Sequence, residues 1–280
     1  MKPATFEYRK ATTVADVVQW LKDAPDGKVI AGGQSLVPLM NFRLARPSVL
    51  IDINGIRALH HVEYDGSTLD LGALMHHQEI ADHPEIQKKF PVLTVAARHI
   101  GHWAIRNRGT LGGSLAHADP ASEWPAAMVA LQAEIDVQGP RGVHRVPASE
   151  FFLGYYTTVL EPDEMIVGAR VPATGASRIG FAEVARRTGD FALAGAFVED
   201  CLDGTGFVTW FGVSDKPQRI AVALPPARET SWREALEQLT LNDVAEDKIA
   251  LAIEIAERAL KHSALVGAAY FGAHAIRGRD

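Results

Sequence analysis

An amphipathic helix near the amino terminus is the first strong hydrophobic pattern in the chain. Apolar residues recur there at intervals of three and four, which places them on one helix face: Val14, Val17, Val18 and Leu21. Thr13 precedes them as a good N-cap, and Asp16 lies in the first turn, where a carboxylate meets the positive end of the helix dipole. The pattern therefore predicts a helix that begins directly after Thr13.

A strand, a helix and a second strand are predicted next, joined by short connections. The strand at residues 28–31 runs into Gly32 and Gly33, the helix covers about residues 35–44, and the second strand covers residues 49–53. This order predicts a βαβ-like unit. Farther along, apolar runs predict strands at residues 68–72, 134–137 and 165–171 and a helix at about 92–103.

A segment of small and helix-breaking residues precedes the last third of the chain. Residues 172–177 are typical of a linker, and residues 180–186 and 207–213 beyond it are predicted strands of a smaller α+β domain. Apolar residues at intervals of four, three and four predict a closing helix: Ile249, Ile253, Ala256 and Leu260. Asp243 and Glu246 have the spacing of a capping box before it. The predicted fold class is α+β.

Composition limits the size of the protein and its partners. A chain of 280 residues is long enough for about two domains, and 47% apolar residues provide a sizeable core. Lysine and arginine total 28 against 34 aspartates and glutamates, and the net charge of −6 argues against nucleic acid as a partner. No apolar run approaches the ~18–20 residues of a membrane span, and the polar start has no apolar stretch of the kind found in signal peptides. We therefore expect a soluble cytoplasmic protein.

Cysteine and histidine usage argues against a metal site. The single Cys201 excludes an internal disulfide and a cysteine-ligated zinc or iron–sulfur site built from this chain alone. The 11 histidines include adjacent pairs at 60–61 and 76–77, whose side chains would diverge on a strand, and His99 and His102, which would share a helix face. No carboxylate lies four residues from the latter two to complete a zinc motif, so we expect surface or core histidines and no metal ligands.

Two loops that contain glycine pairs carry the candidate chemistry. In residues 31–40, a strand ends in Gly32 and Gly33, and Ser35 can N-cap the helix that follows. In residues 106–120, two arginines and several hydroxyls surround a second glycine pair that also opens a helix. Free N–H groups and the dipole at a helix start suit a phosphate, and glycine lets the main chain approach it.

The two loops together favour a clamp for a diphosphate, although neither matches the Rossmann or the P-loop pattern. Arg106 and Arg108 add local positive charge, and Thr110 and Ser114 could bond phosphate oxygens. A single glycine pair is most often a tight turn without a ligand. From the residues alone, a dinucleotide or similar phosphoester and a plain turn both stay open.

Three other side chains have simpler interpretations. Asp52, at the end of a predicted strand, is expected to bond nearby main-chain groups. Trp103 and Trp124 flank the second loop, and we expect both in the core, with the shielding of a ring from water as the alternative.

Four segments resemble the FAD-binding medium subunits of the molybdenum hydroxylases, a family that includes the carbon monoxide dehydrogenase medium subunit and the FAD domain of xanthine dehydrogenase. They are residues 30–36, 46–53, 105–120 and 186–192. The resemblance implies a two-subdomain FAD-binding fold of the vanillyl-alcohol-oxidase (PCMH) type over residues 1–176, divided at about residues 58 and 59. A smaller C-terminal α+β domain would cover residues 177–280.

The resemblance also implies a set of FAD-binding residues. One side of the FAD diphosphate would meet Ile30, Ala31, Gly32, Gly33, Gln34, Ser35 and Leu36, and the other Thr110, Leu111, Gly112, Gly113 and Ser114. Ile100 and Ile166 would lie near the flavin, Asp119 and Glu123 would bind the cofactor, and Phe191 takes the place of a tyrosine that some relatives carry beside the isoalloxazine ring. Relatives often have a lysine where this chain has residues 181–185, so by this resemblance the chain lacks whatever that lysine contributes near the flavin.

By this resemblance the chain is a FAD-carrying electron-transfer subunit. A large partner chain would hold the molybdenum cofactor, and a small partner chain would hold [2Fe–2S] clusters that pass electrons to FAD and on to an acceptor. FAD would supply the redox chemistry, so we expect no general acid or base in this chain. Two alternatives remain: a self-contained flavin oxidase or reductase of the same broad fold, and a non-catalytic nucleotide-binding scaffold.

Overall fold

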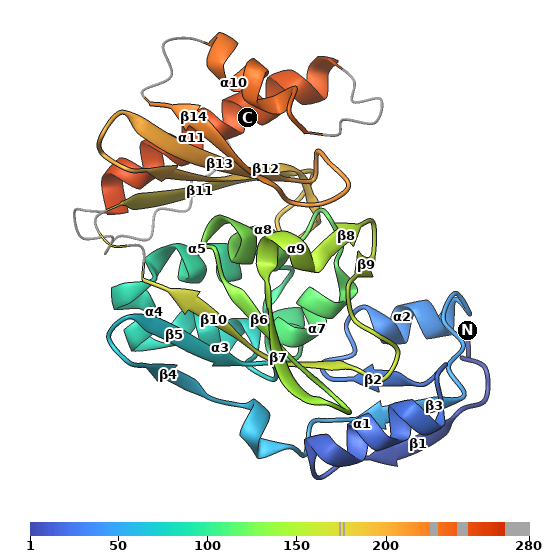
Figure 1. The fold of residues 1–280 in the computed structure, drawn as a ribbon. Helices are drawn as coiled ribbons and strands as arrows, with labels where there is room; N and C mark the ends of the chain where they lie inside the picture. The colour runs from blue at the N-terminus through green and yellow to red at the C-terminus, as the bar shows by residue number, and fades with distance from the viewer. Residues whose placement is uncertain (174, 176, 225–228, 240–245, 267–280) are drawn as a thin grey trace.

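Three larger sheets and one small hairpin organise the part of the chain that the structure describes (Figure 1). The structure is a computed structural model and describes residues 1–173, 175, 177–224, 229–239 and 246–266. In Figure 1 a three-stranded unit lies at one side, a five-stranded sheet with its helices forms the middle, and a four-stranded sheet with two helices lies at the other end.

The amino-terminal unit is a small parallel sheet with two helices. Its strands are β1 (Glu7–Lys10), β2 (Lys28–Ile30) and β3 (Val49–Asp52), in the order β1-β3-β2, and its helices are α1 (Val14–Asp23) and α2 (Leu36–Asn41). The predicted βαβ unit is confirmed, because β2 and β3 flank α2 and pair in parallel.

The predicted N-cap of α1, Thr13, is also confirmed, and it forms a capping box with Asp16. The Thr13 Oγ1 accepts the amide of Asp16 at 3.1 Å, and the Asp16 carboxylate accepts the amide of Thr13 at 3.0 Å. The predicted extent of α2 is wrong: the helix ends at Asn41, and Arg43 has φ +58°, a left-handed conformation that does not continue a helix.

The middle of the chain is a five-stranded antiparallel sheet in the order β4-β5-β10-β6-β7. Its strands are β4 (Val62–Tyr64), β5 (Thr68–Gly72), β6 (Glu134–Gly139), β7 (Gly142–Pro147) and β10 (Met165–Pro172). A 3-10 helix, Arg57–Leu59, leads into it, and β8 (Phe152–Gly154) and β9 (Thr157–Thr158) form the small hairpin.

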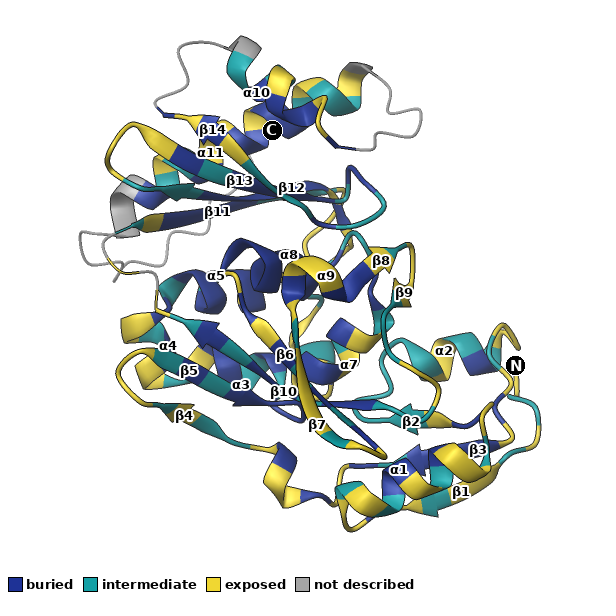
Figure 2. Cartoon of the chain, viewed as in Figure 1, coloured by how far each residue is buried: buried dark blue, intermediate teal, exposed yellow. Residues whose placement is uncertain are grey.

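Short helices cover one face of this sheet. They are α3 (His77–Asp82), α4 (Pro84–Lys89), α5 (Pro91–His99), α6 (Trp103–Arg106), α7 (Leu111–His117), α8 (Glu123–Ala130) and α9 (Ala148–Phe151). Every residue of α8 is buried, whereas β7 at the sheet edge is largely exposed (Figure 2). Since α8 contacts β12 and β13 as well, it forms the layer between two sheets.

The helix predicted at residues 92–103 is two helices. α5 ends at His99 because Ile100 is extended, with ψ 111°, and Gly101 takes φ +50°. His102 then precedes α6, so His99 and His102 do not share one helix face. The expected core position of Trp103 is wrong, since the residue is 67% exposed, while Trp124 is fully buried as expected.

The carboxy-terminal part is a four-stranded antiparallel sheet backed by helices. Its strands are β11 (Arg178–Ala185), β12 (Ala192–Asp200), β13 (Thr205–Phe211) and β14 (Arg219–Ala223), and its helices are α10 (Glu229–Leu236) and α11 (Glu246–Val266). The predicted strands and closing helix are thus confirmed, although Asp243 of the expected capping box lies outside the described residues.

The two faces of β11 serve two different cores. Phe181 packs in the large core of the five-stranded sheet, and Ala182 packs in the core beneath α11. Gly180 lies against α11 so closely that a β-carbon would be 1.8 Å from the carbonyl oxygen of Ala259. Since side chains alternate along a strand, Glu183 points with Phe181 toward α5 and α8.

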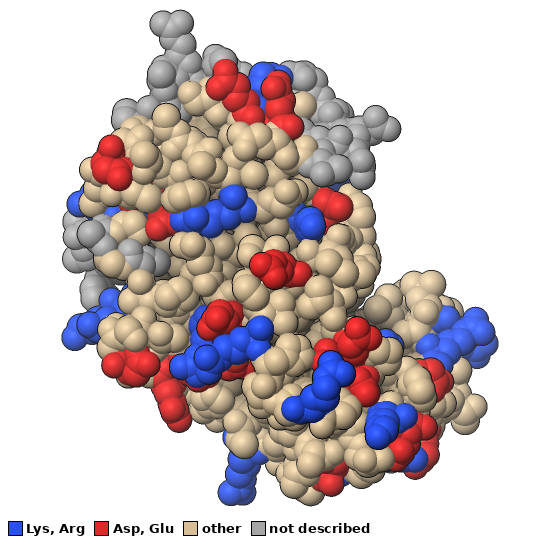
Figure 3. All heavy atoms as spheres, viewed as in Figure 1, with Lys and Arg blue, Asp and Glu red and all other residues tan. Residues whose placement is uncertain are grey.

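The surface shows no strong separation of charge on the face drawn in Figure 3, where acidic and basic side chains are interspersed. Within the described ranges, no helix combines the length and the apolar content that crossing a bilayer requires.

Candidate functional site

The two glycine-pair loops, far apart in sequence, touch each other in the structure. A β-carbon on Gly32 would lie 2.0 Å from the carbonyl oxygen of Arg108 and 2.9 Å from the Cα of Gly109. The main chain of the first loop can approach the second this closely only without a side chain at Gly32. The predicted convergence of the two loops is therefore confirmed, and Gly32 makes it possible.

The first loop presents a run of unpaired amides. In the described part of the chain, the N–H groups of Gly33, Gln34, Ser35 and Leu36 have no hydrogen-bond acceptor; the first bonded amide of the turn is that of Val37, 3.1 Å from the Gly33 carbonyl. Gly33 has φ +70°, the left-handed conformation that occurs in anion-binding nests of successive N–H groups. Successive free N–H groups of this kind form a site for an anion.

Ser35 and Gln34 differ in what they do within this loop. Ser35 precedes α2, as predicted, but its hydroxyl makes no capping hydrogen bond. The side-chain amide of Gln34 donates to the Gly32 carbonyl at 2.8 Å and so closes the turn from the side. The expected N-cap bond of Ser35 is therefore wrong, because α2 starts here without a side-chain acceptor.

The amides of the second loop are already bonded within the protein, and the expectation of free N–H groups at both helix starts is wrong for this one. The N–H groups of Leu111 and Gly112 donate to the carbonyls of Met75 and Ala73, each at 2.9 Å. Those of Gly113 and Ser114 donate to the hydroxyl and the carbonyl of Thr110, at 3.2 and 3.0 Å. The start of α7 is thus bonded to the segment between β5 and α3.

Packing explains two glycines of the second loop. A β-carbon on Gly112 would lie 2.7 Å from that of Ala73, and one on Gly109 would lie 2.6 Å from Nε2 of His77. Gly113, in contrast, is exposed, and a β-carbon there would meet only the Thr110 hydroxyl, at 2.9 Å. Gly113 and the half-exposed Ser114 are therefore the open part of this loop.

Arg106 and His77 hold the second loop in place. The Arg106 guanidinium donates to Gln78 Oε1 at 2.9 Å and to the Gly101 carbonyl at 3.0 Å, so it braces the end of α5 rather than standing free for a phosphate. His77 is buried, and its Nδ1 accepts the indole N–H of Trp124 at 2.9 Å. Burial lowers the pKa of His77 to about 3, so its ring is neutral.

Glu123, at the start of α8, is buried and hydrogen-bonds the carboxyl of Glu183 on β11. Two carboxyl groups can hydrogen-bond only when they hold a proton between them. Burial, and then the Glu183 charge, raise the pKa of Glu123 well above its usual value, and burial raises the pKa of Glu183 to about 7. Oε2 of Glu183 is buried without a partner among the described residues.

Asp119 follows α7 and is buried near this pair. Its Oδ1 accepts the amide of Ala121 at 2.9 Å, and its charge contributes to the raised pKa of Glu123. Glu183 was not among the residues singled out from the sequence, although it lies in the 181–185 segment where relatives carry a lysine. That departure in sequence was the one available indication of it.

The remaining predicted residues lie in two settings. Phe191 is 60% exposed. Its loop lies close to the start of α6, since a β-carbon on Gly189 in the same loop would be 2.7 Å from the ring of His102. Ile100 is half-buried and Ile166 is buried, both packed in the large core. Asp52 accepts the amide of Asn54 at 2.8 Å, as expected for a carboxylate at a strand end.

Comparison with known proteins agrees with this architecture. Residues 4–174 match the family described as the FAD binding domain in molybdopterin dehydrogenase. The chain is 42% identical over 208 residues to the 6-hydroxypseudooxynicotine dehydrogenase complex subunit alpha of Paenarthrobacter nicotinovorans, covering 74% of this chain and 70% of that protein. It is 42% identical over 201 residues to the carbon monoxide dehydrogenase medium chain of Hydrogenophaga pseudoflava, and this match covers 71% of this chain and 70% of that protein.

Solved structures extend the similarity over nearly the whole chain. A carbon monoxide dehydrogenase from Hydrogenophaga pseudoflava that lacks the Mo-pyranopterin moiety of the molybdenum cofactor matches with a TM-score of 0.89 and 34% identity, covering 95% of this chain and 99% of that one. Quinoline 2-oxidoreductase from Pseudomonas putida 86 matches with a TM-score of 0.86 and 33% identity, at coverages of 95% and 99%. The expected α+β FAD-binding fold of the PCMH type is confirmed.

Proposed function

The chain belongs to the family of FAD-binding domains of molybdopterin dehydrogenases and its cofactor is FAD, and on this premise we propose that it transfers electrons as the medium subunit of a larger oxidoreductase. FAD supplies the redox chemistry when bound. The chain's own residues bind the cofactor, orient it and keep it between two fixed loops. We place the FAD-binding domain at residues 1–176, divided at about residues 58 and 59, and the C-terminal domain at residues 177–280.

The first loop fits the diphosphate of FAD. Four consecutive amides, from Gly33 to Leu36, have no acceptor among the described residues and can donate to phosphate oxygens. This run of amides is the single observation that carries the assignment. On the second loop, the proposal rests on the open side of Gly113 and on the Ser114 hydroxyl, since the neighbouring amides are bonded to the protein.

Other predicted residues take supporting positions in this proposal. Gly32, Gly109 and Gly112 hold the loops together, because each lies against main chain or a side chain that a β-carbon would strike. The exposed Phe191 offers a ring face to the isoalloxazine. Glu123 is hydrogen-bonded to Glu183. We therefore assign Glu123 an indirect role, in which the two carboxyl groups together form part of the wall of the site.

The partners are inferred from what this chain lacks and from what its relatives are. The lone Cys201 cannot supply the four ligands of an iron–sulfur cluster. Relatives named as a complex subunit and as a medium chain support a division of labour between chains. We therefore propose a large partner with the molybdenum cofactor, a small partner with [2Fe–2S] clusters, and a separate final acceptor.

Affinity purification of the tagged chain from the cells that produce it tests this proposal. We expect a complex of this chain, a large molybdenum-cofactor chain and a small iron–sulfur chain, with FAD bound. The chain by itself should keep FAD but turn over no substrate. A lone chain that is a complete flavin oxidase or reductase would contradict the proposal, as would a chain that binds adenine nucleotides and takes up no flavin.

A further inference from the structure

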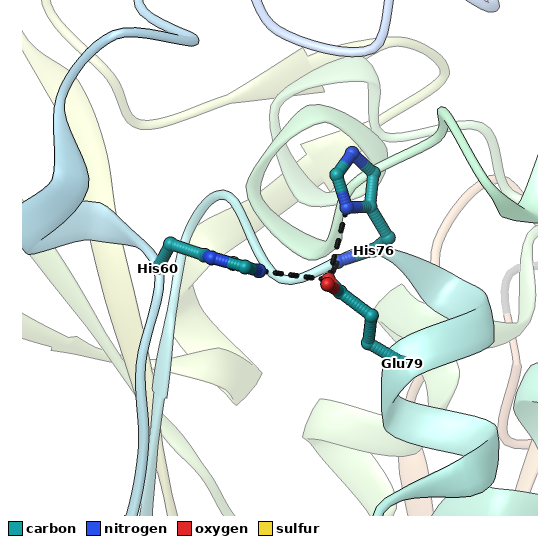
Figure 4. A group of neighbouring side chains, drawn as sticks. All are labelled: His60, His76 and Glu79. Carbon is teal, nitrogen blue, oxygen red and sulfur yellow. Dashed lines mark hydrogen bonds and ion pairs between the residues drawn. The ribbon is translucent and has the colours of Figure 1, made fainter.

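Two histidines and one glutamate converge at the start of α3 (Figure 4). Nε2 of His60 and Nδ1 of His76 lie 2.8 and 2.9 Å from the same oxygen, Oε2 of Glu79. The two rings are 5.9 Å apart between centroids and nearly perpendicular. One ligand atom from each residue lies within 4.8 Å of the other two. Adjacent histidines do point to different partners, as expected, since His61 contacts Asp70 and His77 contacts Trp124; the group takes one histidine from each pair.

The main chain holds these three residues in fixed relation. The segment around His60 is bonded to the segment before α3, since the Leu59 carbonyl accepts the amide of Leu74 at 2.8 Å and the His61 carbonyl accepts that of Gly72 at 3.0 Å. Glu79 is fixed in turn, because its Oε2 also accepts the His76 amide at 2.9 Å in a capping box. The group is therefore preorganised by main-chain contacts rather than by the side chains alone.

We propose that His60, His76 and Glu79 form a binding site for a divalent transition metal, with Zn²⁺ as the ion that this ligand set favours. Two imidazole nitrogens and one carboxylate oxygen are common zinc ligands, with solvent completing the fourth position. The side chains are 44%, 32% and 42% exposed, so the ion can reach them and keep a water.

The site is linked to the second glycine loop. The main chain of His76 forms an isolated antiparallel bridge with Thr110, and the His77 amide donates to the Gly109 carbonyl at 3.1 Å. His60 comes directly after the 3-10 helix that leads out of the amino-terminal unit. A metal bound here would therefore fasten the residue that follows the 3-10 helix to the start of α3, which is bonded to the second loop, and we expect it to stabilise the folded chain.

Calorimetric titration of the chelator-treated full-length chain with ZnCl₂ tests the site. We expect one Zn²⁺ per chain, and at least tenfold weaker binding in each of the variants His60→Ala, His76→Ala and Glu79→Gln, because each removes one of three ligands. His61→Ala is the matched control. His61 is the adjacent histidine, and its Nε2 lies 3.1 Å from Oδ1 of Asp70, outside the group of three proposed ligands. Its binding should equal that of the wild type.

Two further measurements separate metal binding from a plain hydrogen-bonded cluster. Co²⁺ in place of Zn²⁺ should give visible d–d absorption bands in the wild type and in His61→Ala, and none in His60→Ala. Zn²⁺ should raise the melting temperature of the wild type and leave that of His60→Ala unchanged. Absence of stoichiometric binding, or binding that survives His60→Ala and His76→Ala equally, would overturn the proposal and leave the three residues as a hydrogen-bonded group.

Discussion

Gly33→Val should purify almost without flavin, with about a tenth or less of the wild-type FAD content, which corresponds to a loss of about 1.4 kcal/mol or more in binding. Gly33 has φ +70°, and a β-branched residue there is strained by an amount on the order of 1–2 kcal/mol. The added β-carbon would also lie 3.1 Å from Val37 Cγ2 and 3.3 Å from Ile30 Cδ1. Relief of the strain and of both contacts requires the main chain of residues 33–36 to shift, which displaces the amides that we assign to the diphosphate.

The ratio of flavin to protein absorbance measures this loss, with far-UV circular dichroism as the check on folding. Gly66→Val is the matched control, because Gly66 also has a positive φ, +97°, and no atom lies within 4 Å of its added β-carbon. The Gly66→Val variant carries the same kind of main-chain strain, but in the turn between β4 and β5 and not in the first glycine-pair loop. Full flavin content in Gly33→Val, or an equal loss in Gly66→Val, would show that the first loop does not hold the diphosphate.

Glu183→Gln should make the protein more stable at pH 8 and change it little near pH 5. Burial raises the pKa of Glu183 from its usual 4.5 to about 7, so the folded chain holds a proton that the unfolded chain releases at lower pH. The wild type therefore loses stability as the pH rises from 4.5 to about 7, and the loss stays constant above that. Glutamine can keep a hydrogen bond to Glu123 without this proton. At pH 8 the free energy of unfolding should therefore rise by an amount on the order of 1–3 kcal/mol.

Urea unfolding at the two pH values, with FAD in the same excess, measures this difference. Glu63→Gln is the control, because Glu63 is an exposed carboxylate on β4 and its replacement should leave the pH dependence of the wild type unchanged. If Glu183→Gln stabilised the protein equally at pH 5 and pH 8, or destabilised it at pH 8, Glu123 and Glu183 would not share a proton in the folded protein.

Much of the fold could be predicted because it depends on local patterns. The α1 helix and its N-cap follow from Thr13 and the apolar stripe, and the βαβ unit follows from two short apolar strands around a helix. The helix breaks could not be predicted as well. The main-chain conformations of Ile100 and Gly101 end α5, but the apolar pattern continues through both residues and so does not indicate the break.

The glycine loops show the same limit within the site. Their meeting could be predicted from their shared chemistry, but the reason for each glycine could not. Gly112 is needed because of Ala73, nearly forty residues earlier, and the amides of α7 are taken by carbonyls of that same distant segment. Only the paired three-dimensional positions reveal that the first loop has free amides and the second does not.

The pairing of distant segments also explains the two side-chain groups that the sequence did not indicate. Glu183 meets Glu123 because α8 packs against the carboxy-terminal sheet, and His60 meets His76 because the Leu59 carbonyl accepts the amide of Leu74. His60 and His76 are sixteen residues apart and Glu123 and Glu183 sixty, so no local spacing marks either meeting.

A crystal structure of the chain with FAD bound tests the central claim most directly. We predict that diphosphate oxygens lie about 2.7–3.2 Å from the amide nitrogens of residues in the 33–36 run, and that the second loop meets the cofactor through Gly113 and Ser114. A diphosphate bound elsewhere, with those four amides facing solvent or other protein atoms, would contradict this account of how the chain holds its cofactor.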